Sequence, residues 1–143
     1  MKRANGSTIP ALIDASWRFL LPPVLVFILS SLTDALYDRV WWYDIPMHLA
    51  GGAAVALGMH LALASLERRK LTPRLPPCLR LLFLVAAAAL VGVAWELYEF
   101  LMDLYVHLGP VVQPSVADTM KDFANDLIGA VAAGAAAEHF SRK

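Results

Sequence analysis

Four long apolar segments limit what this 143-residue chain can fold into more than any other feature of its sequence. They cover residues 16–33, 45–66, 79–103 and 118–140, and the last of them is the least hydrophobic. A helix needs about 20 apolar residues to cross a hydrocarbon core of about 30 Å. The sequence therefore predicts an all-α fold, in which residues 1–143 form a single transmembrane domain, an integral membrane bundle of four helices.

The composition excludes several other classes of protein. Hydrophobic residues make up 59% of the chain and charged residues 17%, whereas soluble domains average about 45–50% and about 25%. The one cysteine, Cys78, cannot form an intrachain disulfide. The sequence has no zinc-type Cys/His spacing, phosphate-binding glycine loop or nucleophile elbow. It has no basic stripe with interleaved aromatics, so nucleic acid is not an expected partner.

The first apolar segment has an alternative interpretation as a cleaved signal peptide. Lys2 and Arg3 supply the basic start that such a peptide needs. However, the following "SSLTDALYD" offers no small-x-small cleavage site, and Arg18 lies late for a signal peptide. We therefore predict a retained span, with Pro22 and Pro23 kinking its start.

The distribution of basic residues predicts the orientation of the bundle. With four spans, ten of the twelve Lys and Arg residues fall on one side of the membrane, and the other side keeps Arg39 and Lys121. Because short cytoplasmic loops are rich in Lys and Arg, both termini are predicted to be cytoplasmic. The ten residues are Lys2, Arg3, Arg18, Arg68, Arg69, Lys70, Arg74, Arg80, Arg142 and Lys143.

Acidic residues gather at the opposite, outer ends of the second, third and fourth spans. With about 3.6 residues per turn and about 1.5 Å of rise per residue, those of each span share one helix face and lie at similar depths. An acid facing lipid at mid-bilayer costs about 2.5–3.5 kcal/mol, so the three faces are predicted to point at one another. The residues are Asp44 and His48, then Glu96, Glu99 and Asp103, then Asp118, Asp122 and Asp126.

Such a cluster needs protons or a cation to offset its repulsion in a low dielectric. Lys121, at the rim, is the one basic residue near it. Carboxylates with one imidazole suit a divalent ion such as Mg²⁺, Mn²⁺, Ca²⁺ or Zn²⁺. The sequence therefore predicts a metal site, with Glu96 or Asp126 as a catalytic general base. The predicted ligands are Asp44, His48, Glu99, Asp118 and Asp122.

Each of these residues also has a structural interpretation. Asp44 can be an N-cap of the second span, and Asp118 a cap or a first-turn acid favoured by the helix dipole. Asp103 can simply be solvated at a helix end. A lone histidine such as His48 is more often packed than functional, and we interpret His60, which lies off the acidic face, as structural. The deeper acids can pair without any further role.

Small residues predict that the second and fourth spans pack closely. Close packing of helices in lipid favours glycine and alanine at the interface. Such contact would also narrow the gap between His48 and Asp122. The residues are Gly51, Gly52, Ala54 and Gly58 in the second span, and Gly129, Ala130, Ala133 and Gly134 in the fourth.

Three short motifs resemble a known group of proteins. "WELYEF" followed by "DTMKDFANDLIGA" is similar to the YjdF-like bacterial inner-membrane proteins, a family of unknown function, and "YDIPMHLAGG" resembles that family's D-x-x-x-H motif. The resemblance covers residues 43–134 and implies the same helical layout and polar cluster in a bacterial inner (plasma) membrane. It implies no particular reaction. The matching positions are Asp44, His48, Glu96, Glu99, Asp118, Asp122, Gly129 and Ala130.

A wider VanZ-like group has a related layout of D-K-x-x-H, E-x-x-Q and D-x-x-x-N-x-x-G. This chain departs from that layout at three positions. Ile45 stands in place of the lysine, Glu99 in place of the glutamine and Asp126 in place of the asparagine.

Three functions fit these features. The first is a metal-dependent hydrolase or transferase that acts on a lipid-linked or envelope substrate, with membrane lipid as its partner. The second is a component of proton- or cation-coupled transport that uses the acids as a relay. Such a relay needs polar residues that continue into the cytoplasmic half of the spans, and only His60 offers one. The third is a non-catalytic assembly protein held together by shared protons.

Overall fold

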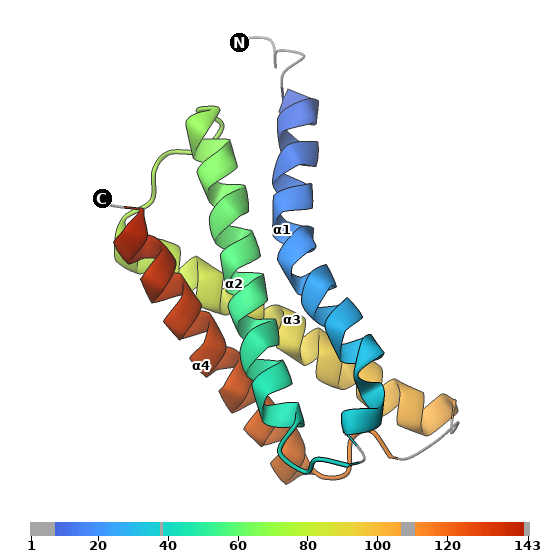
Figure 1. Cartoon of the computed structure of the whole chain (residues 1–143). Helices are drawn as coiled ribbons and strands as arrows, with labels where there is room; N and C mark the ends of the chain where they lie inside the picture. The colour runs from blue at the N-terminus through green and yellow to red at the C-terminus, as the bar shows by residue number, and fades with distance from the viewer. Residues whose placement is uncertain (1–7, 38, 107–110, 142–143) are drawn as a thin grey trace.

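The computed structural model describes residues 8–37, 39–106 and 111–141, and this part of the chain is helical (Figure 1). The all-α prediction is therefore confirmed. Of the basic residues used to predict orientation, Lys2, Arg3, Arg142 and Lys143 lie outside the described residues. The elements are α1 (Thr8–Leu32), the short 3₁₀ helix η1 (Asp34–Leu36), α2 (Asp44–Arg68), α3 (Pro77–Tyr105) and α4 (Val116–Phe140).

Three of the four long helices in the described residues can cross a membrane by length and composition. These are α1, α2 and α3, with mean hydropathies of 1.7, 1.7 and 2.2 in their most apolar windows. The more polar α4 is not among them, since its first half carries Asp118, Lys121, Asp122 and Asp126. Three candidate spans are thus established, and a fourth belongs to the proposals below.

The first helix is longer than the predicted span, because it begins at Thr8 rather than near residue 16. Asp14 stabilises this extension. It accepts a 2.9 Å hydrogen bond from Arg18 within α1 and a 2.6 Å hydrogen bond from Ser65 of α2. Pro22 and Pro23 consequently lie inside α1 rather than at its start, and the helix curves along its length in Figure 1.

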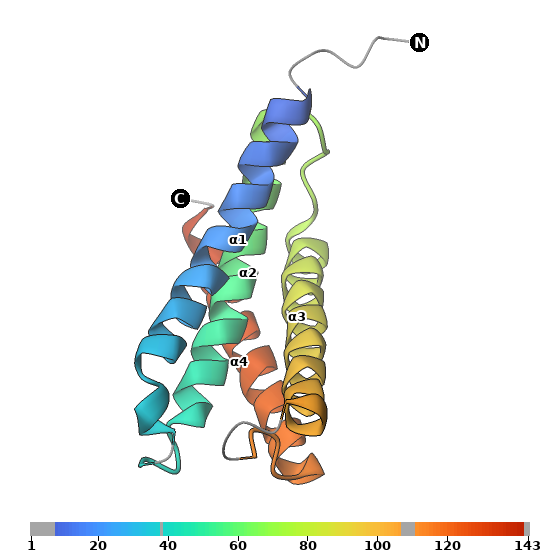
Figure 2. The same ribbon diagram turned by 90° about the vertical axis from the view of Figure 1, so that its right-hand side faces the viewer.

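The central helix is α2, which packs against α1, α3 and α4, while α4 also packs against α3 (Figures 1 and 2). The buried core between these helices is apolar and built mainly from small side chains, which lets the helix axes approach closely. Its members are Val55, Ala56, Leu84, Ala88 and Ala130.

Two glycines allow a close contact between α2 and α4. A Cβ on Gly52 would overlap the backbone carbonyl of Asp126, and a Cβ on Gly129 would overlap the backbone carbonyl of Leu49. The predicted close packing of these two helices is therefore confirmed. The contact places the first turns of α2 beside the first turns of α4.

A network of charged residues, which the sequence analysis did not predict, ties α2, α3 and α4 together at the other end of the bundle. Arg80 of α3 is only 5% exposed. Its guanidinium lies 2.6 Å from Glu67 of α2 and 2.8 Å from Glu138 of α4, and it donates to the His60 carbonyl at 3.1 Å. The His60 ring lies 3.3 Å from Glu138. We call these four residues the basic-end network.

Candidate metal centre

Asp44 and His48 occupy the first two turns of α2. Residues four apart stack on one helix face, and here His48 Nε2 lies 3.3 Å from Asp44 Oδ1. Asp44 does not cap this helix, because the N-cap residue is Tyr43. On α4 the cap is Ser115, whose hydroxyl accepts the Asp118 amide hydrogen at 3.1 Å. The carboxylates of Asp44 and Asp118 are therefore left for other partners.

Two further carboxylates reach His48 from α4. Asp122 Oδ1 lies 3.9 Å from Nε2, and Asp126 Oδ1 lies 3.4 Å from Nδ1. Burial is nearly complete, because His48, Asp122 and Asp126 are 8%, 3% and 6% exposed. Each ring nitrogen of His48 thus faces its own carboxylates, Asp44 and Asp122 on one side and Asp126 on the other.

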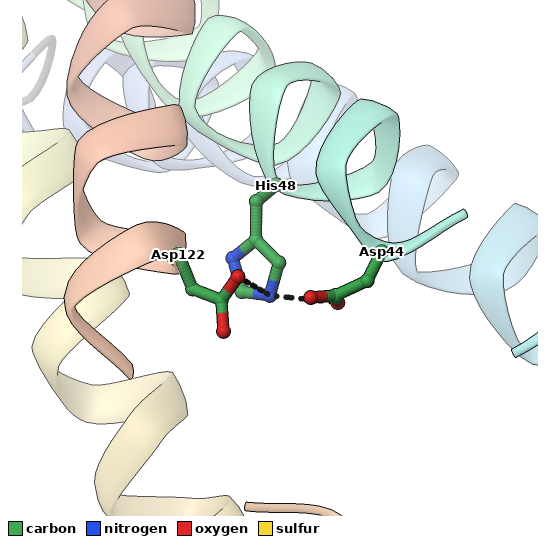
Figure 3. Close-up of side chains that lie close together, drawn as sticks. All are labelled: Asp44, His48 and Asp122. Atoms are coloured by element: carbon green, nitrogen blue, oxygen red, sulfur yellow. Dashed lines mark ion pairs between the residues drawn. The ribbon is translucent and has the colours of Figure 1, made fainter. Parts of the chain in front are cut away.

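Asp44, His48 and Asp122 form a group that could hold a metal ion, which we call the metal group (Figure 3). Each offers one ligand atom, and these atoms lie within 4.8 Å of one another. Histidines that bind metals commonly donate their other ring N–H to a carboxylate, which fixes the tautomer. Asp126 is placed to accept that hydrogen from Nδ1. The other ring nitrogen, Nε2, then faces Asp44 and Asp122.

Lys121 is more closely involved than the rim position expected from the sequence. Its Nζ lies 2.6 Å from Asp118, 2.9 Å from Asp44 and 3.4 Å from Asp122. The ammonium group therefore neutralises part of the acidic cluster and would compete with a metal ion for two of the three ligands. Asp118 belongs to the site through this lysine rather than as a member of the metal group.

The glutamates of α3 have other partners. Glu99, a predicted ligand, accepts a 2.8 Å hydrogen bond from the Trp95 indole and is not part of the metal group. Glu96 is buried and accepts a 3.0 Å hydrogen bond from the Gln113 side chain. Its second oxygen, Oε1, has no hydrogen-bond partner among the described residues. The loop residue Gln113 gave no signal in the sequence.

At the level of Asp126, α3 contributes a glycine rather than a carboxylate. A Cβ on Gly92 would come within 2.6 Å of Asp126 Oδ2. Gly92 precedes Glu96 by one helical turn and therefore lies on the acidic face of α3. This position is the one sequence feature that indicated a contact of Gly92 with the site. Asp103, which can be solvated at a helix end, is not buried and accepts backbone hydrogen bonds from Val112 at 2.9 Å and Gln113 at 2.8 Å.

These features define an all-helical membrane protein with a buried His/Asp group that could hold a metal ion. Residues 8–143 match the family described as predicted membrane protein (DUF2238), and the chain belongs to this family. The resemblance to YjdF-like proteins is consistent with that membership, and the relation to the VanZ-like group stays a prediction. Searches among curated proteins and among solved structures found no match.

Proposed function

We propose that this chain binds a divalent metal ion at Asp44, His48 and Asp122 and uses it for hydrolysis or group transfer on a lipid-linked or envelope substrate. The observation that carries the proposal is the environment of the His48 ring. Nε2 faces two carboxylate ligands, while Nδ1 faces the buried Asp126, 3.4 Å away. Zn²⁺ readily takes imidazole and carboxylate donors together, whereas Mg²⁺, Mn²⁺ and Ca²⁺ would depend mainly on the carboxylate oxygens, and three protein ligands leave positions for water and substrate.

The surrounding acids suit different tasks in such a centre. Asp126 orients His48, so Glu96 is the better candidate for the general base, because its buried Oε1 has no hydrogen-bond partner within the described part of the chain. Asp118 would hold Lys121 away from the metal through their 2.6 Å ion pair. Glu99 is hydrogen-bonded to Trp95 and would lie near the metal centre without binding the metal ion. The metal would activate a water molecule or polarise a phosphoryl or carbonyl oxygen.

The proposal includes four spans, with both termini in the cytoplasm of a bacterium and the metal group near the outer face. Two observations support it. Asp122 and Asp126 of α4 are buried, and α4 packs against α2 and α3, so these two carboxylates would not face lipid. The basic residues of the described segments also lie mainly in the first half of α1 and in or beside the connection from α2 to α3. Figure 1 shows these parts at the end of the bundle opposite to the start of α2. The basic residues there are Arg18, Arg68, Arg69, Lys70, Arg74 and Arg80.

Metal analysis of the purified protein tests the centre. We expect Mn²⁺ or Zn²⁺ to bind with a stoichiometry of about one, and His48→Gln and Asp122→Asn to abolish that binding because each removes one of only three protein ligands. Asp126→Asn should weaken affinity by about 10–100-fold, as loss of a carboxylate behind a ligand histidine usually does. Elemental analysis and titration calorimetry measure both effects.

Asp103→Asn is the control, because this acid accepts hydrogen bonds from the Val112 and Gln113 backbone amides and lies outside the metal group. It should retain metal, and thermal unfolding should show that all variants fold. Equal metal content in wild type and His48→Gln would overturn the proposed centre.

A non-catalytic assembly role is the second candidate, and the ion pairs of Lys121 favour it. If Lys121 and His48 exist only to neutralise acids that hold α2 against α4, the cluster needs no metal. Asn at both Asp44 and Asp122 would then preserve cellular function. A transport relay has less support, because the apolar core of Val55, Ala56 and Leu84 lies between the metal group and the basic-end network.

A further inference from the structure

An apolar cleft of about 350 Å³ opens between α1 and α3, with α2 as its floor. Gly51, Gly52 and Val55 form that floor. The cleft exists because α1 and α3 pack on α2 rather than along each other. The ring contact of Phe27 with Trp95, centroid to centroid 5.9 Å, joins α1 to α3 at one end of it. This volume lies within the range of about 300–1,000 Å³ that is usual for small-molecule sites.

The two ends of the cleft differ in chemistry. On α1 its lining runs from Phe19 to Ser30, a length of about 16 Å at the rise of an α-helix. The Phe19 end is apolar, whereas the Ser30 end carries Tyr37, His48 and Asp126. Ser30 and Tyr37 share a 2.9 Å hydrogen bond. Burial raises the pKa of the Tyr37 hydroxyl.

The cleft leads directly to the candidate metal centre. His48 and Asp126 line its polar end, and the same two side chains face each other at 3.4 Å beside the metal group. Its side walls belong to α1 and α3, both of which are apolar enough to cross a membrane. Val24 and Val91 line these walls and are still 46% and 38% exposed. The opening therefore faces the hydrocarbon of the bilayer rather than water.

We propose that this cleft binds one hydrocarbon chain of a membrane phospholipid, with the phosphate of its headgroup at the metal group. An apolar cleft that ends in ionisable side chains matches the shape and polarity of an amphiphile. A uniformly polar molecule would not fit it. Phosphate oxygens are good ligands for divalent ions, so the head and the chain are recognised by adjoining parts of one site. The position of the phosphate rests on the metal centre proposed above; the position of the chain does not.

Photolabelling of the full-length protein in nanodiscs tests the position of the chain. The probe is a phospholipid with a diazirine on its acyl chain. In wild type we expect cross-links to peptides of α1 and α3 that line the cleft. Val91→Trp fills the cleft and should abolish them. Val93→Trp is the matched control, because Val93 is on the same helix, is 53% exposed and does not line the cleft.

A second pair on α1 guards against misfolding of the Val91 variant. Val24→Trp should also abolish the cross-links, whereas Leu25→Trp, at an exposed residue outside the lining, should leave them intact. Equal labelling of folded Val91→Trp and Val93→Trp proteins would overturn the assignment of the chain. So would labelling spread evenly over lipid-facing peptides of wild type.

Paramagnetic broadening tests the headgroup. With Mn²⁺ bound to the protein, the ³¹P signal of a short-chain phospholipid should broaden in wild type and in Val93→Trp, and this broadening should be lost in Val91→Trp. Broadening that is equal in the two valine variants would overturn the placement of the phosphate. Absence of Mn²⁺ binding with cleft labelling intact would remove the metal centre and leave the chain site standing. Binding of Mn²⁺ without labelling of the cleft would remove the chain site and leave the metal centre standing.

Discussion

The ammonium group of Lys121 sets how strongly the acidic cluster can attract another cation. It contacts Asp44, Asp118 and Asp122 at 2.9, 2.6 and 3.4 Å. Two of these three carboxylates belong to the metal group, so a metal ion and the lysine compete for the same oxygens. Asp118, three residues before Lys121 on α4, gives the lysine a place to remain when the other two bind metal. If the proposed metal ion binds, the cluster would therefore exchange one cation for another rather than keep one fixed ion pair.

Lys121→Met should therefore raise metal affinity. A unit charge about 4 Å from a divalent ion is worth about 2 kcal/mol in water, or about 30-fold in affinity. Lys121 is 36% exposed, so we expect an effect of that size rather than a larger one. Calorimetric titration with Mn²⁺ measures it. Arg39→Met, at an exposed arginine in the connection before α2, is the control and should change nothing; weaker binding by the Lys121 variant would contradict the exchange argument.

Helix periodicity was enough to predict which side chains meet on α2 and α4, but not what α3 brings to them. Asp44, His48 and Asp122 could be matched because both helices begin at the same end of the bundle and their polar faces are narrow. The rotation of α3 depends on its packing partners. Trp95 takes Glu99 as a hydrogen-bond partner, and Gly92 is the residue that meets Asp126. The i,i+4 spacing of Trp95 and Glu99 allows their contact, but spacing alone does not show that Glu99 takes this partner rather than a metal ion.

At the scale of elements, the contact of α2 with α4 determines the geometry of the site. Gly52 and Gly129 make reciprocal contacts with backbone carbonyls of the opposite helix. The same backbone segments carry His48 and Asp126, so the separation of the helices also sets the separation of these two side chains. A shift of either helix would change stability and metal geometry together.

Two adjacent glycines provide a matched test of this contact. Gly52→Ala places a Cβ against backbone atoms of Asp126 that cannot move aside, and overpacking of this kind costs about 1–3 kcal/mol. Gly51→Ala is the control, because its Cβ would meet only Asp126 Oδ1, at an ordinary 3.8 Å. Thermal unfolding in detergent should show a lower midpoint for the first variant alone, together with weaker metal binding. Equal unfolding midpoints for the two variants would show that α2 and α4 can move apart without loss of stability.

The extent of each element was predictable where the local signals were strong. Pro77 in the first turn of α3 and Ser115 at the cap of α4 lie close to the predicted starts of those helices. The start of α1 was not predictable, because its first turns depend on the bond of Asp14 to Ser65, 51 residues away. The Arg80 network was missed for the same reason. It unites three helices that are far apart in sequence.

At the scale of the whole molecule, charge is divided between the two ends of the bundle. The metal group, Asp126 and Lys121 lie where α2 and α4 begin, and the basic-end network lies where these helices approach their ends. An apolar core separates the two. Arg80 is paired with Glu67 and Glu138 at its own end, so neither buried cluster depends on the other for neutralisation. Each end can therefore be exposed to a different aqueous phase.

This division leads to a prediction of topology that includes the proposed fourth span. Cys78, the one cysteine of the chain, is exposed at the start of α3. In intact spheroplasts a membrane-impermeant maleimide should label it only after permeabilisation, because the proposed topology puts this basic connection in the cytoplasm. In a Cys78→Ser background, Ser115→Cys, just before α4, should react without permeabilisation. Ser141→Cys, just after α4, should again require it.

The contrast between Ser115 and Ser141 decides whether α4 crosses the membrane. Opposite accessibility requires a crossing within Val116–Phe140, even though this helix does not qualify as a span by hydropathy. The physical reason would be that its acids face α2 and α3, so lipid contacts mainly its alanine-rich second half. If both cysteines reacted from the same side, α4 would lie on one face of the membrane. The metal group would then be assembled at a surface, and its acids would need no protection from lipid.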